Sequence, residues 1–549
     1  MKQNAGIRLG MLVCLSIALL AFRTHATSIE VSGEVSGQWN VDTVKVTSDI
    51  FLPGDQTLTI DPGVRVEFMG HFQFTVRGSV IALGLPDEMI EFTRSDTTGF
   101  SDTLTGAGGW NGIFYEHLDP SVDSSLFSHC RFRFGKAITM VDSIGLYGGA
   151  FRVVEFSKIA FFHCVFEYNH AYRWGGAIYG RQASVRIKDC VFRYNESGRS
   201  DPPWGYGGAV CFVYSSPEIV SNLFEQNSST GIGGGASFEY SDPLVTHNIF
   251  SGNFSGLGGG LGYLRSEPQQ VCSNNLVVDN EARFFGGGIA CVAAHTVFVN
   301  NTVTNNVAVY GGGYYCNDSA VPSNYNCLFY NNFAYEGMEI YIWDIRSAPN
   351  FYFCNVPGDT SGFAGSGGHE GYHGEYLNNL DTLVEFSGTG SYPFQLGASS
   401  PMKDAGTPDT SSLMVPGRDL AGNPRIYNNR LDIGAYEWNP GLGIASNERQ
   451  GIDVTLFPVP AFENLTIRFT LNNAHKVGFS VYRMSGELVY RHTPVDCSTG
   501  TNEICWDLKD HEQNRLSAGC YVLQLHGNHL SNGVLFYQDS EKHGDGFMV

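Results

Sequence analysis

The chain has 549 residues, of which 42% are apolar and only 16% are charged, and it contains 67 glycines, 38 phenylalanines and 27 tyrosines. This composition favours β-structure with tight turns over helical bundles. The formal net charge of −21 excludes nucleic acid as a partner, because phosphate contacts need clustered Lys and Arg, and it argues against anionic membrane surfaces. We predict no cofactor. The excess of acidic residues would be compatible with Ca²⁺ as a counterion, but the sequence shows no set of ligands for it.

Residues 1–26 predict a secretory signal peptide. Lys2 and Arg8 form a basic start, the apolar stretch from Met11 to Phe22 is too short to span a bilayer, and Thr24-His25-Ala26 provides a cleavage site. No later run is apolar enough for a membrane helix. We therefore expect an exported, soluble chain without a membrane span.

A repeat of about 26 residues then occupies the middle of the chain, and each copy carries two motifs. The first motif is [Asn/Cys]-x-[Phe/Val]-x-x-Asn, and the second is a run of glycines followed by an apolar stretch. The first motif begins at Cys130, Cys164, Cys190, Asn222, Asn248, Asn275, Asn301 and Cys327, and the glycine runs begin at Gly148, Gly175, Gly207, Gly233, Gly258, Gly286 and Gly311.

This repeat predicts a parallel β-solenoid with one coil per copy, because coils that stack ~4.8 Å apart place equivalent residues in columns. A β-propeller needs about 40 residues per blade, a leucine-rich repeat needs a Leu/Asn consensus that is absent, and the glycines exclude a helical repeat. We expect a core column of Phe132, Phe166, Phe192, Phe224, Phe250, Val277, Val303 and Phe329. We expect an amide ladder of Asn195, Asn227, Asn253, Asn280, Asn306 and Asn332.

The repeat resembles right-handed parallel β-helix proteins of the bacterial pectate-lyase-like superfamily. The resemblance covers roughly residues 30–395 and includes FLPGDQTLTIDPGVRVEFMG as entry coils. The run Asp432–Glu437, D-I-G-A-Y-E, resembles the segment that ends many such helices. The resemblance implies an all-β chain, with the right-handed parallel β-helix at 27–395 and its terminal segment at 396–438.

After a polar linker at 439–453, residues 454–538 show short alternating strands typical of a small β-sandwich. This module resembles the C-terminal, Ig-like sorting domain of the type IX secretion system. The resemblance implies export by that secretion machinery. It departs from the family at Val459-Pro460, where Asn-Pro is usual, and in the polar tail 539–549. The matching stretches are Phe457-Pro458-Val459-Pro460, Val481-Tyr482-Arg483-Met484-Ser485-Gly486, Trp506-Asp507 and Ala518-Gly519-Cys520-Tyr521.

The cysteines show no C-x-x-C spacing that would indicate a zinc site. In the C-terminal module, Cys497 and Cys505 could close a local disulfide across a hairpin. Two free thiols would give the same sequence pattern, so both alternatives stay open.

One zinc-hydrolase pattern occurs, H-E-x-x-H, with His369 and His373 as the two possible metal ligands. That chemistry needs both histidines on one face of a helix. The pattern lies in a stretch with five glycines between residues 365 and 374, which would cost a helix about 5 kcal/mol relative to alanine. We therefore predict a surface loop.

Polysaccharide lyases on this fold use acidic clusters with a Lys or Arg base. The residue before each repeat motif forms a polar column: His129, His163, Asp189, Ser221, His247, Asn274, Asn300 and Asn326. His163 and Asp189 would be neighbours in it, with Arg131 and Arg193 nearby, and a general acid–base pair could form there. A solvated turn edge explains the same column more simply.

Aromatic residues precede most glycine runs and would form a stripe along one edge of the solenoid. Trp and Tyr rings can stack on sugar rings, although the same rings could instead stack on each other and seal the turn. The candidate ligand-binding residues are Tyr147, Trp174, Tyr206, Phe285, Tyr310 and Tyr335, with Ile232 and Leu257 between them.

These features predict a secreted or surface-displayed, non-catalytic rod that binds extracellular polysaccharide or acts as an adhesin. A polysaccharide lyase or other carbohydrate-active enzyme on the same fold is the first alternative, and a structural surface-layer protein is the second. An enzyme needs converging charged residues on one face, whereas a binding protein needs exposed aromatic residues.

Overall fold

The computed structural model describes two stretches of the chain. The first is 28–439, with gaps at 117, 120, 139–144, 199–203, 268–270, 389–391, 412 and 429. The second is 454–538, with gaps at 458–460, 462, 472–473, 484–487, 513, 518 and 528–529. The predicted signal peptide and tail lie outside the described residues, as do the linker after Asn439, Val459-Pro460 and the stretch 484–486.

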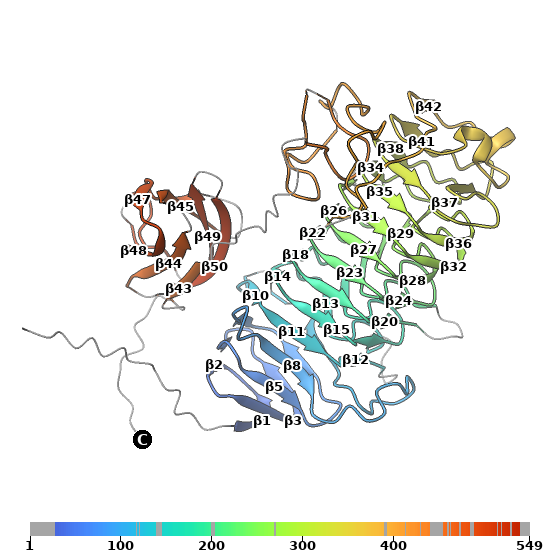
Figure 1. Ribbon diagram of the computed structural model, residues 1–549. Coiled ribbons are helices and arrows are strands. Elements are labelled where there is room, and N and C mark those ends of the chain that lie inside the picture. Colours follow the sequence, from blue (N-terminus) through green and yellow to red (C-terminus); the bar gives the residue numbers. More distant parts are fainter. Residues whose placement is uncertain are drawn as a thin grey trace, which may run out of the picture.

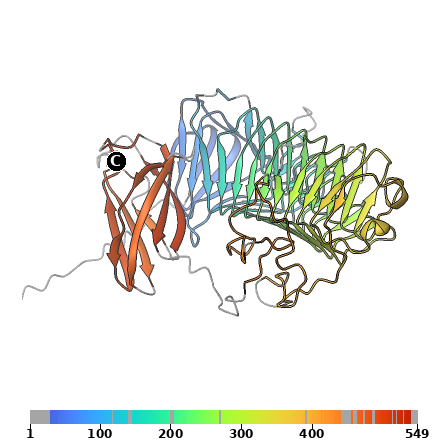
Figure 2. The same cartoon turned by 90° about the horizontal axis from the view of Figure 1, so that it is seen from above.

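Residues 28–377 form a right-handed parallel β-helix, which confirms the predicted fold class (Figures 1 and 2). Each full rung contains four strands. One such rung runs through β14 (Ile159–Phe162), β15 (Val165–Glu167), β16 (His170–Ala171) and β17 (Ile178–Arg181). The repeat motif forms the second of these strands, and the apolar stretch after the glycine run forms the fourth.

The strands stack into three parallel sheets. The largest contains two rows, joined through β1 (Ser28–Glu34) and β3 (Thr43–Leu52), which we name the ladder row and the glycine row. The ladder row contains β5 (Arg65–Phe68), β8 (Ile90–Arg94), β11 (Cys130–Arg133), β15, β19 (Val191–Arg193), β23 (Leu223–Glu225), β27 (Ile249–Ser251), β31 (Leu276–Val278), β35 (Thr302–Thr304) and β39 (Leu328–Tyr330). The glycine row contains β6 (Phe74–Val76), β9 (Ile113–Glu116), β13 (Phe151–Val154), β17, β21 (Val210–Val213), β25 (Ala236–Glu239), β29 (Leu261–Leu264), β33 (Ile289–Val292), β37 (Tyr314–Asn317) and β40 (Ile340–Ile342).

The other two sheets complete the cross-section of the solenoid. The 13-stranded sheet contains β2 (Gly37–Trp39), β4 (Thr57–Ile60), β7 (Ser79–Leu83), β10 (Ser125–Ser128), β14, β18 (Arg186–Lys188), β22 (Glu218–Val220), β26 (Leu244–Thr246), β30 (Val271–Ser273), β34 (Val297–Val299), β38 (Ser323–Tyr325), β41 (Asn350–Tyr352) and β42 (Tyr376–Leu377). The short sheet contains β12 (Lys136–Ala137), β16, β20 (Glu196–Ser197), β24 (Ser228–Ser229), β28 (Phe254–Leu257), β32 (Glu281–Phe285) and β36 (Val307–Tyr310).

The predicted phenylalanine column is confirmed and forms the centre of the core. Phe132 pairs in register with Phe166, and the register continues rung by rung to Phe329. Neighbouring rings stack with centroids 4.6–4.9 Å apart. These residues are fully or almost fully buried, so each rung continues the hydrophobic column of the rung before it.

The predicted amide ladder is also confirmed, and it begins one rung earlier, at Asn169. In each step the side-chain amide donates to the side-chain oxygen of the next rung at 2.9–3.0 Å. The ladder ends at Asn332, which donates to the buried carboxylate of Glu339. Burial raises the pKa of Glu339 to about 7.

A second amide ladder runs parallel to the first and was not predicted. Asn222, Asn248, Asn275 and Asn301 are joined in the same way at 2.9–3.0 Å. Cysteines replace asparagine at its two ends: for instance, the backbone N–H of Cys164 donates to the Cys190 Sγ at 3.3 Å. This explains why the first position of the motif can be either Asn or Cys, since either side chain accepts a backbone hydrogen bond from the preceding rung.

The corners between strands depend on left-handed backbone conformations. The whole polar column from His129 to Asn326 has φ between 49° and 59°. The first glycine of each run has φ between 63° and 72°. The second glycine is needed because the coils approach closely: a Cβ at Gly208 would lie 2.1 Å from the carbonyl oxygen of Gly234.

The C-terminal module is a small antiparallel β-sandwich. Its core contains Ile467, Phe479, Trp506 and Tyr521. Cys497 and Cys505 are free thiols, and no disulfide joins the cysteines that the structure describes. One sheet contains β43 (Val454–Phe457), β44 (Leu465–Leu471) and β48 (Gly500–Trp506); the other contains β45 (His475–Arg483), β46 (Leu488–Arg491), β47 (Val495–Cys497), β49 (Gly519–Gly527) and β50 (Leu530–Gln538).

Candidate functional site

The aromatic stripe follows the corner between the short sheet and the glycine row. Trp174 pairs with Tyr206, and the column continues through Ile232 and Leu257 to Phe285 and Tyr310. Tyr147 extends this column at its N-terminal end, where its ring centroid lies 5.4 Å from that of Trp174. Five of the six predicted aromatic residues therefore lie in one line along the solenoid.

Tyr335 does not belong to this column, because the structure pairs Tyr310 with Glu336. The register is fixed by the glycine that follows: Gly337 has φ 65° and occupies the same corner as Gly311. Counting back one residue from Gly337 in the sequence gives Glu336, so the pattern already contained this signal. Tyr335 is instead 82% exposed and continues the short sheet, where its backbone N–H donates to the carbonyl oxygen of Val309.

The N-terminal part of the stripe forms an aromatic platform of Tyr147, Trp174 and Tyr206. The Trp174 and Tyr206 rings stack with centroids 5.0 Å apart and planes 1° apart. They rest on the outward side chains of the glycine row, Tyr179, Cys211 and Val213. One side of the platform is thus buried against the solenoid, while all three aromatic residues keep part of their surface in solvent.

The suggested acid–base group His163, Asp189 and Arg193 does not converge. Arg193 points from the ladder row and donates to Glu167 at 2.7 Å. The Asp189 carboxylate lies 3.9 Å from the Lys188 ammonium, and no ion pair joins His163 to Asp189 in the described part of the chain. The reason is geometric: His163 and Asp189 occupy left-handed corner positions, whereas Arg193 lies on the strand after that corner.

The first two histidines of the polar column stack on each other. The rings of His129 and His163 lie 4.8 Å apart. Burial and the neighbouring His163 lower the pKa of His129 to about 4, so this ring is neutral at physiological pH. It lacks the charge that a general acid would need.

The second half of the polar column is covered by the terminal segment, which corrects its interpretation as a solvated edge. His247 and Asn274 contact the carbonyl oxygen of Arg418 at 2.9 and 2.7 Å. Asn300 donates to the carbonyl oxygen of Asp432 at 2.9 Å, and Asn326 accepts from the backbone N–H of Thr407 at 2.7 Å. These side chains therefore bind the terminal segment along the outside of the solenoid.

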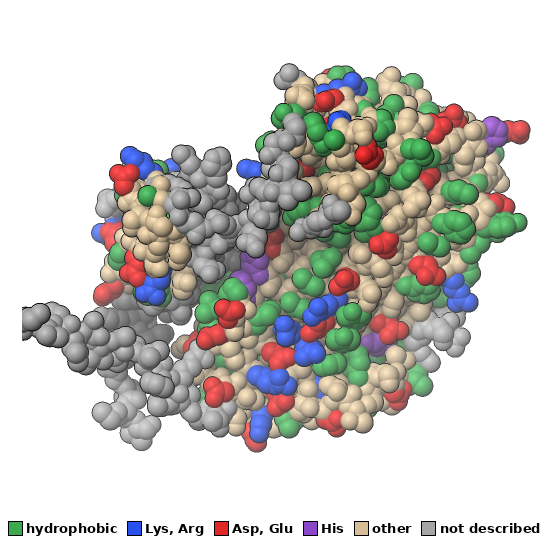
Figure 3. All heavy atoms as spheres, in the orientation of Figure 1, with side chains coloured by type: hydrophobic (Ala, Val, Ile, Leu, Met, Phe, Trp, Pro, Cys, Tyr) green, Lys and Arg blue, Asp and Glu red, His purple; other side chains and the backbone are tan. Residues whose placement is uncertain are grey.

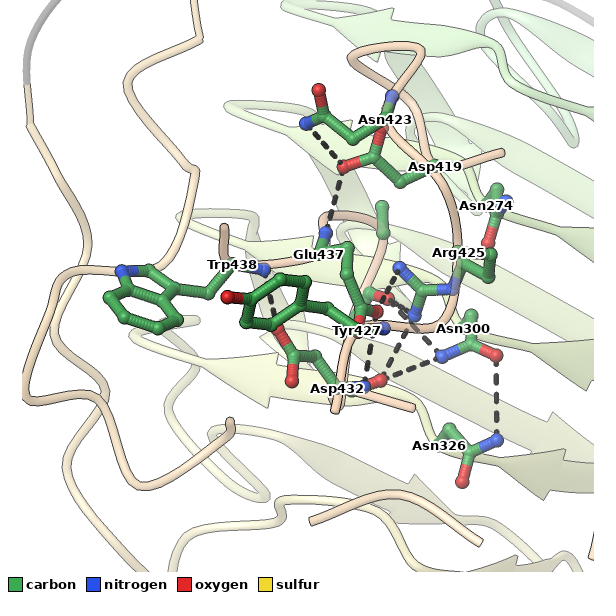
Figure 4. Close-up of polar contacts among 12 residues, drawn as sticks. Asn274, Asn300, Asn326, Asp419, Asn423, Arg425, Tyr427, Asp432, Glu437 and Trp438 are labelled. Atoms are coloured by element: carbon green, nitrogen blue, oxygen red, sulfur yellow. Dashed lines mark hydrogen bonds and ion pairs between the residues drawn. The ribbon is translucent and has the colours of Figure 1, made fainter. Parts of the chain in front are cut away.

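A buried charge cluster holds the terminal segment together, around the D-I-G-A-Y-E run (Figure 4). Arg425 is fully buried and donates to the carbonyl oxygens of Asp432 and Gly434 at 2.9 and 2.7 Å. Its Nη1 lies 3.5 Å from Oε2 of Glu437. Asp419 accepts from the backbone N–H of Glu437 at 2.8 Å. The guanidinium is thus paired with one carboxylate and interacts electrostatically with those of Asp419 and Asp432. This makes the cluster structural and sensitive to protonation.

This excess of carboxylates predicts that the terminal segment is held more tightly at low pH. Burial raises the pKa of Glu437 to about 8 and that of Asp432 to about 6, although Arg425 acts in the opposite direction. A carboxyl whose folded pKa lies above its unfolded value stabilises the fold below the unfolded pKa, and this contribution is lost as pH rises through the folded pKa. We expect protection of residues 419–438 in hydrogen exchange to fall by about 1–3 kcal/mol between pH 5 and pH 9.

The variant Glu437→Gln provides the control for this pH dependence. It removes the group with the higher pKa, so we expect a flatter profile over the same range. Peptides from β15 and β19, which follow the first half of the polar column, should show no such trend, once intrinsic exchange is corrected for. An unchanged slope in the variant would assign the effect to another group.

The two histidines of the H-E-x-x-H pattern do not lie on an α-helix. His369 begins a single 3-10 turn, η2 (His369–Gly371), which follows another short turn, η1 (Asp359–Gly362), and His373 lies beyond it. Both side chains are exposed, and His373 Nδ1 lies 3.2 Å from the carbonyl oxygen of Gly371. In the described ranges, no group of three or more His, Cys, Asp or Glu side chains is placed to hold a metal ion.

Two family models match the chain. Residues 121–356 match the family described as right handed beta helix region, and residues 455–533 match the secretion system C-terminal sorting domain. No curated protein matches the chain. Within the described residues, no helix is long and apolar enough to cross a membrane.

Two solved structures show a partial similarity to the chain. The periplasmic alginate epimerase AlgG is 11% identical, with a TM-score of 0.28, over 62% of this chain and 76% of the epimerase. Tailspike protein 3 of bacteriophage CBA120 is 12% identical, with a TM-score of 0.30, over 66% of this chain and 59% of the tailspike.

The family models and the observed strand arrangement agree on both modules. The parallel rungs occupy the residues of the first match, and the antiparallel sandwich occupies those of the second. The chain is therefore a right-handed parallel β-helix protein with a type IX secretion system C-terminal sorting domain, and it is exported to the cell surface or the extracellular space.

Proposed function

We propose that this protein is a surface-displayed rod that binds extracellular polysaccharide without altering it chemically. In this proposal residues 27–395 are the rod, 396–438 brace its side, and 454–538 direct export. The aromatic platform of Tyr147, Trp174 and Tyr206 is the observation that carries the proposal. Its two stacked rings rest on the solenoid and are partly exposed. These two side chains would therefore lose little conformational entropy when a sugar ring stacks on them.

The charged residues favour binding over catalysis. Arg193 is engaged by Glu167, and His163 and Asp189 form no ion pair with each other among the described residues. A lyase would need a base and a charge-neutralising group directed at one point. The same arrangement is compatible with a structural surface-layer role, in which the platform would only seal the corner of the solenoid.

Replacing Trp174 with alanine should weaken retention of the exported protein on its polysaccharide about tenfold or more. The reason is that one well-placed aromatic contact contributes about 1–2 kcal/mol. A polysaccharide array gives the measurement, followed by affinity electrophoresis on the polymer that retains the protein. Circular dichroism melting would show whether the variant keeps its fold.

The matched control is Tyr240→Ala. Tyr240 stacks on Tyr214 with ring centroids 4.8 Å apart and is exposed, but it lies at another corner of the solenoid. We expect full retention in this variant. Equal retention by Trp174→Ala and wild type would refute the platform, and unsaturated products from a uronate polymer would support the lyase alternative instead.

A further inference from the structure

A second exposed surface lies on the outer face of the short sheet, near the C-terminal end of the solenoid. We name it the β28–β36 patch. Its side chains are 40–82% exposed, although all are apolar or aromatic. Figure 3 shows apolar side chains gathered on this side of the molecule, over β32 and β36 as labelled in Figure 1. The patch consists of Phe254, Phe284, Val307, Val309, Phe333 and Tyr335.

The patch results from a change in one column of the short sheet. In the N-terminal rungs this column is polar, with Lys136, His170, Glu196 and Ser228 paired in register. From Phe254 onward the same column continues as Phe254, Glu281, Val307 and Phe333. Exposed apolar surface of this kind on one face of an exported protein is typical of an interaction site.

Two opposite charges lie inside this apolar surface. Glu281 and Arg283 are both exposed and are two residues apart on β32, so they share one face of the strand. Neither forms an ion pair within the described part of the chain, and the Arg283 guanidinium lies over the Phe284 ring at 5.3 Å. Between Phe254 and the valines of β36 lies a shallow hollow of about 410 Å³.

We propose that the β28–β36 patch is the interface of a homodimer. A two-fold axis through Ala282 would place Glu281 of each copy opposite Arg283 of the other, because a two-fold interface brings the same strand against itself in reverse. The remaining patch residues would then pack between two sheet faces ~10 Å apart. A second copy satisfies both unpaired charges at once, and its apolar face matches the apolar surroundings of those charges.

A polysaccharide is a less suitable occupant of this patch. Valine and phenylalanine make up five of its six residues, and they offer no hydrogen-bonding groups to sugar hydroxyls. The dimer proposal does not rest on polysaccharide binding. The aromatic platform belongs to rungs nearer the N-terminus, so we expect its residues to stay exposed in the dimer.

Sedimentation velocity of the exported full chain, over a dilution series, tests this proposal. We expect a dimer that dissociates on dilution. Glu281→Arg alone and Arg283→Glu alone should each weaken the dimer at least tenfold, since each places two pairs of like charges in the interface. The double variant should regain the affinity, and a mixture of the two single variants should form a mixed dimer.

The control is Arg181→Glu, a charge reversal at an exposed position on β17 in the glycine row, which should leave the dimer unchanged. Phe333→Ser gives an independent test through the apolar contact and should also yield monomers. A wild-type chain that stays monomeric at every concentration would overturn the proposal. So would failure of the double variant to recover when both single variants dissociate. Retention on a polysaccharide that is lost only in Phe333→Ser, with a monomeric wild type, would assign the patch to glycan binding.

Discussion

Replacing Asn253 with alanine should lower the free energy of unfolding of the solenoid by about 3–5 kcal/mol. The Asn253 amide donates to Phe224 O and to Asn280 Oδ1, and its oxygen accepts two bonds from Asn227. The substitution removes all four bonds. It leaves buried groups on two neighbouring rungs without partners, at about 1–3 kcal/mol for each group that stays unsatisfied.

Urea unfolding monitored by circular dichroism measures this effect, and Ser251→Ala is the matched control. Ser251 is on the same rung, on β27, but faces outward and is partly exposed. Its replacement should change stability by less than about 0.5 kcal/mol. If both variants unfolded at the same urea concentration, the amide ladder could not be the main source of cohesion between rungs.

Replacing Arg425 with methionine should release the terminal segment, at a cost of about 3–5 kcal/mol. Methionine has a similar length but cannot balance the negative charge of the cluster at a pH above 6, the approximate pKa of Asp432. A buried charge that loses its partner is strongly destabilising. The carbonyl oxygens of Asp432 and Gly434 would also lose their donor. We expect hydrogen exchange to become fast in residues 396–438.

The same experiment reports on the solenoid beneath the segment. The corner amides near Asn274 and Asn300 should exchange faster, because their side chains would lose the carbonyl groups that now cover them. Arg418→Met is the control: Arg418 is exposed on the same segment, and its side chain donates to Gly422 O at 2.6 Å. Unchanged protection in the Arg425 variant would show that the corner contacts alone hold the segment in place.

Much of the solenoid was predictable because its repeat places each side chain above its equivalent. The Phe column and the first amide ladder follow from spacing alone, since a residue such as Asn227 bonds to the residue one repeat later. The second ladder was missed because cysteines occupy its two ends, and the change from Cys190 to Asn222 hides the continuity of the column. Recognising it required knowing that both side chains accept the same backbone hydrogen bond.

The candidate sites were less predictable, because they depend on small differences between rungs. Tyr335 and Glu336 differ by one position, yet only one of them faces the stripe. Arg193 is close to Asp189 in sequence, but its bond to Glu167 directs it elsewhere. The direction in which a side chain points near a corner depends on the backbone conformation there. Composition and repeat spacing do not reveal that conformation.

The sequence by itself determined the winding of the chain, the content of its core and its route of export, because these depend on patterns that recur at short range or within one module. Only the tertiary structure decided that residues 396–438 cover half of the polar column. It also decided that Arg425 lies buried among three carboxylates and that apolar side chains gather around Glu281 and Arg283. These arrangements join residues up to 171 positions apart, as between His247 and Arg418, and no local pattern encodes contacts over such a separation.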